Sequence, residues 1–168
     1  MPGEVSNTPI RQLNHVSVTT ADIDRSVRFY RDVVGLTVLG SGTKKSPELS
    51  AITGFPDLEL RWAELGIEGF RFLELFEYVT PRGERLEQRT SDPGCMHFGL
   101  SVRDIDAIHD AVMKSDGTVV APPVTVRGGD WDGARAMYVR DPDGATVEFI
   151  EFPAGNELFL GGDDAEGA

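Results

Sequence analysis

The chain repeats one pattern of residues at an offset of 82 positions, which relates His15 to His97. The two histidines stand in "NHVSVTTADID" and "MHFGLSVRDID", each seven residues before an identical Asp-Ile-Asp. Gly35 and Gly117 follow at the same offset. Matched residues in the same order at one offset indicate that the same supersecondary unit occurs twice.

Each copy is predicted to form a strand, a helix and three further strands. Asp22 and Asp104 suit helix N-caps, and the glycines that follow suit C-caps. The first copy continues with "LTVLG", "LELRWAEL" and "FRFLELFEYV", and the second with "TVVA", "ARAMYVR" and "ATVEFIEF", all of which have the pattern of strands. The segments 41–56 and 122–133, which contain Gly and Pro, are expected to be loops.

These elements divide the chain into two βαβββ modules, 11–80 and 95–153, joined by a linker at 81–94. The ends, 1–10 and 154–168, are Gly-rich or acidic and are expected to be a disordered N-terminus and an acidic tail. A chain of 168 residues is long enough to bury a core. The predicted fold class is α+β, with two paired βαβββ modules.

Net charge, hydropathy and cysteine content argue against nucleic-acid binding, a membrane span and an intramolecular disulfide. The net charge of −12 disfavours nucleic-acid binding, because neutralising phosphates requires a basic surface. No apolar stretch has the length of a membrane span, and the N-terminus lacks the apolar core of a signal peptide. The single cysteine, Cys95, rules out an intramolecular disulfide. We expect a cytoplasmic protein that acts on a small molecule, without a nucleic-acid or membrane partner.

Alternation along the first strand of each copy places the histidines on the more polar face of the sheet. In "LNHVSVT", Val16 and Val18 point to one side and His15 points to the other. In "MHFGLSV", Phe98 points to one side and His97 to the other, with glycine and serine as its companions. The apolar sets should pack under the helices, which leaves both histidines facing a cavity.

The last strand of each copy carries a glutamate on an otherwise apolar face. Glu74 alternates with Phe72 and Phe76, and Glu148 lies among Thr146, Ile150 and Phe152. A carboxylate in such surroundings is costly unless it is paired or binds a metal. The neighbouring glutamates, Glu77 and Glu151, have the opposite parity and should point away from this face.

These two observations together predict one metal site. If the two sheets face each other, His15, Glu74, His97 and Glu148 converge. Two imidazoles and two carboxylates suit a divalent first-row ion with positions left open for water or substrate. The alternative is that each histidine is an ordinary hydrogen-bonded or surface residue.

The chain resembles a known superfamily in "LNHVSVTTADIDRSVRFYRDVVGLTV", "FLELFEY", "GCMHFGLSVRDIDAIHDAV" and "YVRDPDGATVEFIE". Over roughly residues 11–153 it looks like the vicinal oxygen chelate (glyoxalase, bleomycin resistance protein and dioxygenase) superfamily, and most like methylmalonyl-CoA epimerase and lactoylglutathione lyase. The resemblance implies an open, cup-shaped mixed sheet around one divalent ion (Ni, Co, Mn, Zn or Fe). It implies His15, Glu74, His97 and Glu148 as the ligands.

The resemblance also implies a class of reaction. It points to a metal-dependent lyase, isomerase or epimerase that stabilises an enolate of a small carbonyl or thioester substrate, with Glu148 and Glu74 as the catalytic carboxylates. The alternatives are an Fe(II)-dependent ring-cleaving dioxygenase and a non-catalytic, drug-resistance-type binding protein. Similar proteins are often homodimers, and the two modules can pair within one chain or across a dimer.

Four residues are predicted to contact the substrate: Arg61, Phe72, Phe76 and Trp131. The resemblance to epimerases of this type implies a second catalytic glutamate on the strand before Glu74. Here Arg61 is placed nearest that position, with Glu59 and Glu64 as other candidates. An arginine there would hold an anionic group of the substrate. The alternative is a surface arginine without such a role.

Overall fold

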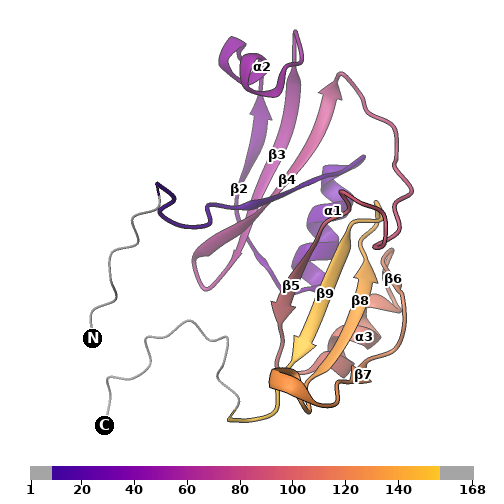
Figure 1. Cartoon of the computed structure of the whole chain (residues 1–168). Helices are drawn as coiled ribbons and strands as arrows, with labels where there is room; N and C mark the ends of the chain where they lie inside the picture. The colour runs from indigo at the N-terminus through magenta and orange to yellow at the C-terminus, as the bar shows by residue number, and fades with distance from the viewer. Residues whose placement is uncertain (1–8, 156–168) are drawn as a thin grey trace. The chain divides into compact units, whose positions relative to one another are not determined.

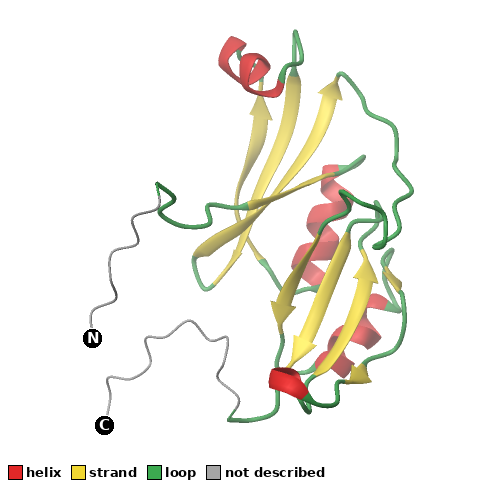
Figure 2. Ribbon diagram, in the orientation of Figure 1, coloured by secondary structure: helices red, strands yellow, loops and turns green. Residues whose placement is uncertain are grey.

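The computed structural model describes residues 9–155, which divide into two compact units with the boundary between Leu86 and Glu87. This boundary falls inside the segment 81–94. The predicted disordered N-terminus and acidic tail lie almost wholly outside the described residues. Each unit is built around its own mixed β-sheet (Figures 1 and 2).

The first unit follows the predicted order of strand, helix and three strands, with one added helix. Its sheet has the order β1-β4-β3-β2, in which β1 runs parallel to β4 and the other pairs are antiparallel. Its elements are β1 (Val16–Thr19), α1 (Ile23–Arg28), the π-helical turn η1 (Phe29–Val33), β2 (Thr37–Lys44), α2 (Pro47–Thr53), β3 (Glu59–Ile67) and β4 (Phe70–Thr80).

The second unit repeats this topology. Its sheet has the order β5-β9-β8-β6, with β5 parallel to β9 and a short strand β7 paired to β8. Its elements are β5 (His97–Ser101), α3 (Ile105–Val112), β6 (Thr118–Val119), β7 (Val124–Thr125), the 3-10 turn η2 (Gly129–Trp131), β8 (Arg135–Arg140) and β9 (Thr146–Glu151). The α+β class with two βαβββ units is confirmed.

The repeated aspartates begin the helices as predicted. The Asp22 carboxylate accepts a hydrogen bond from Arg25 N at 3.1 Å, and the Asp104 carboxylate accepts one from Ala107 N at 2.9 Å. Gly35 ends the first helical segment with a φ of +88°, a conformation that favours glycine.

The predicted C-cap at Gly117 is wrong. Helix α3 ends at Val112, well before Gly117. The Ser115 hydroxyl donates a hydrogen bond to the Val112 carbonyl at 2.8 Å, so the end of the helix is closed locally by a serine.

The structure also corrects both predicted loops. Segment 41–56 contains the end of β2 and helix α2, which lies between β2 and β3 along the chain (Figure 1). Ser46 caps α2 by accepting from Leu49 N at 3.2 Å, Pro47 occupies its first turn, and Gly54 follows its end with a φ of +75°. No residue of α2 is buried, so it shows no apolar periodicity for sequence reasoning to find. Segment 122–133 contains β7 and η2, both too short to show alternation.

One face of each sheet is buried under a helix of the same unit. Helix α1 packs on β3 and β4, and α3 packs on β8 and β9. Each fully buried aliphatic or aromatic side chain contributes about 1.5–3 kcal/mol through the hydrophobic effect. The largest of these side chains are Tyr30, Leu58, Leu60, Leu65, Leu73 and Leu75 in the first unit, and Ile105, Val112, Val139, Val147 and Phe149 in the second.

An arginine ties each helix to the last strand of its sheet. In the first unit, Arg61 on β3 contacts Asp24 and Glu77 at 2.9 Å each, and the Glu77 carboxylate also accepts from Ile23 N at 3.2 Å. Hydrogen bonding to Asp24 raises the pKa of Arg61, so the arginine keeps its charge. Glu77 therefore points away from Glu74, as its parity predicts, yet it is buried (8% exposed). The negative charge at the start of α1 is favourable.

The second unit contains the same arrangement. Arg135 on β8 lies 2.7 Å from Asp106 and 3.5 Å from Glu151, and the Glu151 carboxylate accepts from Ile105 N at 3.2 Å. We call each set an arginine clamp: Arg61, Asp24 and Glu77 in the first unit, and Arg135, Asp106 and Glu151 in the second. The repeat thus extends to residues that the sequence comparison did not match.

We expect Arg61→Met to lower the free energy of unfolding by about 1–3 kcal/mol, because it leaves the buried Glu77 carboxylate without its main cationic partner. The matched control is Arg31→Met, since among the described residues Arg31 pairs with its exposed neighbour Asp32 and its loss should change stability by less than about 0.5 kcal/mol. Urea denaturation of both variants measures the difference. Equal losses would show that the clamp does not stabilise the unit.

The second clamp should make stability depend on acid pH. Hydrogen bonding to Arg135 lowers the pKa of Asp106, so this contribution is present above the pKa of an unfolded aspartate and is lost as the pH falls through the lower folded pKa. Arg135→Met should therefore lose less stability between neutral pH and about pH 3 than the parent chain does. Arg103→Met, at an exposed arginine of the same unit, should keep the parent's pH dependence. Identical pH profiles for all three proteins would refute this assignment.

Candidate metal and active site

The face of each sheet opposite its helix carries a histidine beside a glutamate. On the first sheet, Ser17 of β1 stands opposite Glu74 of β4, and His15 lies two residues before Ser17 with the same parity. On the second sheet, Gly99 of β5 stands opposite Glu148 of β9, and His97 lies two residues before Gly99. Equivalent registers therefore bring equivalent residues together in both units.

The side chains of each pair are in contact. His15 Nε2 lies 3.3 Å from Glu74 Oε2, and His97 Nε2 lies 3.5 Å from Glu148 Oε2. The glutamate side chains are 14% and 18% exposed, whereas the histidine side chains are 38% and 41% exposed. We call these the first half-site (His15 and Glu74) and the second half-site (His97 and Glu148).

The geometry of each half-site fits two neighbouring ligands of one metal ion. Imidazole nitrogen and carboxylate oxygen each bind zinc-like ions at about 2.0–2.2 Å, so two such donors at a right angle lie about 3 Å apart. The observed separations of 3.3 and 3.5 Å are close to this value. Within the described residues of either unit, no group of three or more His, Cys, Asp or Glu side chains is arranged so that it could hold a metal ion. Each half-site thus supplies two donors.

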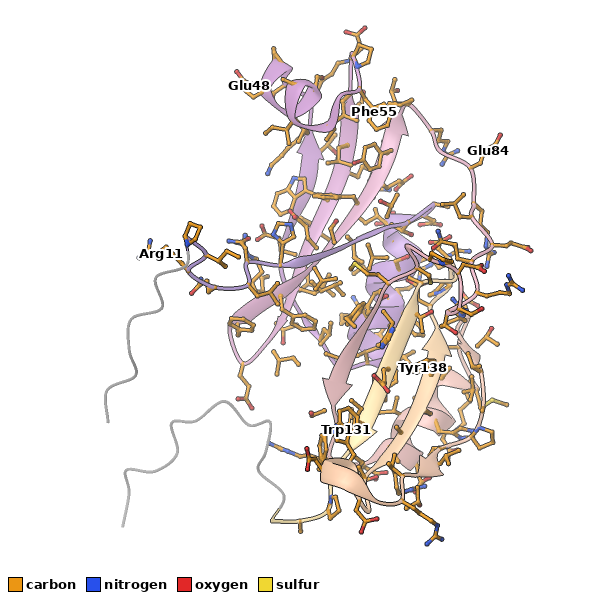
Figure 3. All side chains as sticks on the ribbon, in the orientation of Figure 1. Arg11, Glu48, Phe55, Glu84, Trp131 and Tyr138 are labelled. Atoms are coloured by element: carbon orange, nitrogen blue, oxygen red, sulfur yellow. The ribbon has the colours of Figure 1, made fainter. Side chains whose placement is uncertain are left out.

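The residue across from each glutamate on the next strand differs between the units. In the second unit Tyr138 of β8 stands opposite Glu148, and its hydroxyl lies 3.4 Å from His97 Nε2 (Tyr138 is labelled in Figure 3). Burial, and then the charge of Glu148, raise the pKa of Tyr138, so the hydroxyl keeps its proton at neutral pH. Sequence reasoning missed Tyr138, although the alternation in "ARAMYVR" puts it on the open face.

In the first unit the equivalent position holds Glu64, which was one of the three residues considered for the position of the second catalytic glutamate. Glu64 of β3 stands directly opposite Glu74. Two like charges facing each other across strands are destabilising. Arg71 offsets the charge of Glu64 by donating to it at 2.6 Å, and His15 contacts Glu74 on the other side.

The predicted substrate-contacting residues have different placements. Phe72 and Phe76 are half-buried and flank Glu74 on the same face of β4. Trp131 belongs to η2 of the second unit, and its ring packs edge-on against Phe152 at 5.5 Å (Figure 3). Arg61 lies on the helix side of its sheet and is held by two carboxylates, so we do not retain it as a substrate-binding residue.

A pocket of about 200 Å³ in the first unit lies between α1 and strands β2 and β3. Arg61 and Asp24 line it, together with Ser41, Thr43 and apolar side chains, but neither His15 nor Glu74 does. This pocket is therefore separate from the first half-site.

Comparison with known proteins identifies the class to which this fold and these pairs belong. Residues 12–149 match the family model described as the glyoxalase/bleomycin resistance protein/dioxygenase superfamily. The chain belongs to this superfamily.

Individual relatives carry the names of enzymes. The chain is 30% identical over 164 residues to a 2-epi-5-epi-valiolone epimerase of an Actinomyces species, covering 92% of this chain and 84% of that protein. It is 33% identical over 143 residues to a lactoylglutathione lyase of Haemophilus influenzae, covering 83% of this chain and 92% of that protein. A crystal structure of a glyoxalase family protein from Bacillus cereus matches the fold with a TM-score of 0.73 at 18% identity, covering 89% of this chain and 99% of that one. None of the helices within residues 9–155 is long and apolar enough to cross a membrane.

Proposed function

We propose that this chain is a divalent-metal-dependent lyase, isomerase or epimerase that acts on a small carbonyl or thioester substrate through a stabilised enolate. The observation that carries the proposal is the pair of equivalent half-sites, each with an imidazole and a carboxylate in contact. The relatives named epimerase and lactoylglutathione lyase support this class of reaction.

The two half-sites are proposed to hold one ion together. His15, Glu74, His97 and Glu148 would be its ligands, and nickel, cobalt, manganese, zinc and iron all suit imidazole and carboxylate donors. The half-sites would join either within one chain or between the two chains of a homodimer. When bound, the ion supplies a Lewis acid that polarises the substrate's carbonyl oxygen.

The residues of the chain would then move one proton. A carboxylate, Glu148 or Glu74, takes the proton from the carbon beside the carbonyl, and the electron pair of that C–H bond passes into the enolate. Return of the proton to the opposite face of the same carbon inverts it, whereas return to the neighbouring carbon isomerises the substrate. The protonated hydroxyl of Tyr138 is placed to donate a hydrogen bond near Glu148, and Phe72 and Phe76 exclude water beside Glu74.

The contact between His15 and Glu74 favours this proposal over a dioxygenase. An iron site of two histidines and one carboxylate is complete with His15, His97 and Glu148 and would not need Glu74 as a donor. Glu74 nevertheless lies 3.3 Å from His15 with only 14% of its side chain exposed. A buried carboxylate in that place is explained by its use as a fourth ligand or as a base.

The first test is the metal content of the purified chain and of its His97→Ala variant, by elemental analysis. We expect about one nickel, cobalt, manganese or zinc ion per chain, and loss of that ion in the variant, because two donors of the second half-site are reduced to one. His109→Ala is the matched control, since His109 lies on α3 and pairs with Asp110; this variant should keep the ion.

The outcomes of the metal analysis separate the three classes of function. Iron that reacts with oxygen would move the assignment to a dioxygenase. A chain that contains no metal and takes up none on addition would be a binding protein rather than an enzyme of this type.

The second test follows the proton. In heavy water, incubation with 2-epi-5-epi-valiolone or lactoylglutathione, the two compounds in the relatives' names, should introduce deuterium beside the carbonyl of at least one of them. Glu148→Gln should slow this exchange by about 10²–10⁴-fold, because an amide cannot take the proton. Glu87→Gln, at an exposed glutamate of the same unit, should leave the exchange unchanged. Equal effects of the two substitutions would contradict a proton-transfer role for Glu148.

A further inference from the structure

The open face of the first sheet has an indole ring lying across strand β2. Gly40 and Gly42 of β2 stand opposite Glu64 and Trp62 of β3 on this face. A Cβ atom built on Gly42 would lie 3.2 Å from Trp62 Nε1, and one built on Gly40 would lie 3.4 Å from the same ring. The two glycines therefore leave the space that the indole fills, and the ring packs close to the backbone of β2.

Lys44 ends β2 on the same face as Gly42, two residues later. Its ammonium nitrogen lies 4.7 Å from the centroid of a Trp62 ring, within the range of a cation–π interaction. This contact holds an otherwise exposed lysine side chain over the ring.

Lys44 differs from the other cations of its sheet because no carboxylate within residues 9–155 balances its charge. Among the described residues, no carboxylate forms an ion pair with Lys44, although the chain carries a net charge of −12. The other cations of the same sheet are neutralised, Arg71 by Glu64 and Arg61 by Asp24 and Glu77. Lys44 thus remains available to an anion from outside.

The position of Lys44 relates it to the first half-site. Strand β2 is separated from β4 by β3 alone, so these two strands lie about 10 Å apart. Lys44 stands opposite Leu60, four residues along β3 from Glu64, which faces Glu74, so the Cα atoms of Lys44 and Glu74 are about 16 Å apart. Glu74, Glu64, Trp62 and Lys44 share one face of this sheet. A small molecule whose reacting carbon lies at Glu74 can therefore extend over Trp62 toward Lys44.

We propose that Lys44 and Trp62 form a subsite that binds an anionic group of the substrate, a carboxylate or a phosphate, remote from the reacting carbon. The proposal rests on the proposed function, since it takes Glu74 to mark the reacting end. An ammonium is a compact point charge that suits either anion. Binding energy gained far from the reacting carbon helps to orient the carbon at the catalytic carboxylate.

The test uses the tryptophan itself as the reporter. The chain has two tryptophans, so Trp131→Phe leaves Trp62 as the single one. In this background, chelator-treated protein is titrated with inorganic phosphate and, separately, with acetate, at an ionic strength held constant with sodium chloride. We expect a saturable change in Trp62 fluorescence with at least one of the two anions. The anion that binds more tightly indicates whether the substrate's anionic group is a phosphate or a carboxylate.

The matched pair of variants is Lys44→Gln and Lys45→Gln in the same background. Lys45 is an equally exposed lysine that follows the end of β2, so its loss changes the net charge by the same amount. We expect Lys44→Gln to weaken anion binding by about tenfold or more and Lys45→Gln to leave it within about twofold, since a direct charge contact adds about 1.4 kcal/mol or more. No saturable change with either anion, or equal effects of the two variants, would overturn the proposal.

This experiment is independent of the metal. Because the protein is free of metal, the anions cannot bind through an ion at the half-sites. If anion binding depends on Lys44 but the chain takes up no metal, the subsite is supported and the proposed reaction is refuted. If the chain takes up metal but binds neither anion, the proposed reaction is supported and the subsite is refuted.

Discussion

The burial of one sheet face in each unit is the constraint on which the other features depend. Alternating side chains of a strand cannot all enter the same core, so the apolar set of β4 and β9 packs under α1 and α3 and the other set faces outward. A slip of one residue in the first sheet would exchange Leu73 and Leu75 for Phe72 and Glu74. The hydrophobic core therefore fixes the face on which the histidine–glutamate pairs stand, although none of those four residues belongs to it.

The arginine clamps add a second, electrostatic constraint on the same strands. Glu77 and Glu151 lie three residues after Glu74 and Glu148, and each is bonded both to an arginine and to the first turn of its helix. A strand fixed at that point has little freedom to shift along its neighbours. The clamps thus hold the half-site glutamates in register without touching them, and they account for the position of Arg61 on the helix side of its sheet.

The two units share a framework but present different chemistry. Around the first half-site the neighbouring side chains are charged, with Glu64 held by Arg71, and further along the same face Lys44 covers Trp62. Beside the second half-site stands the neutral hydroxyl of Tyr138, whose raised pKa keeps it a proton donor. The repeat thus provides a histidine–glutamate pair in each unit, whereas the side chains around the pair differ between the units.

The sequence by itself determined the order of elements, the two helix N-caps and the face of each histidine and glutamate, because period-two alternation and capping chemistry are local properties. It did not reveal helix α2, which buries no residue, or the end of α3, which depends on a serine hydroxyl. Only the tertiary structure decided that Arg61 is held by Asp24 and Glu77, that Tyr138 and Glu64 stand across from the half-site glutamates, and that Lys44 lies over Trp62. Those facts follow from strand register, which joins residues far apart in the chain through long-range pairing that no local pattern encodes.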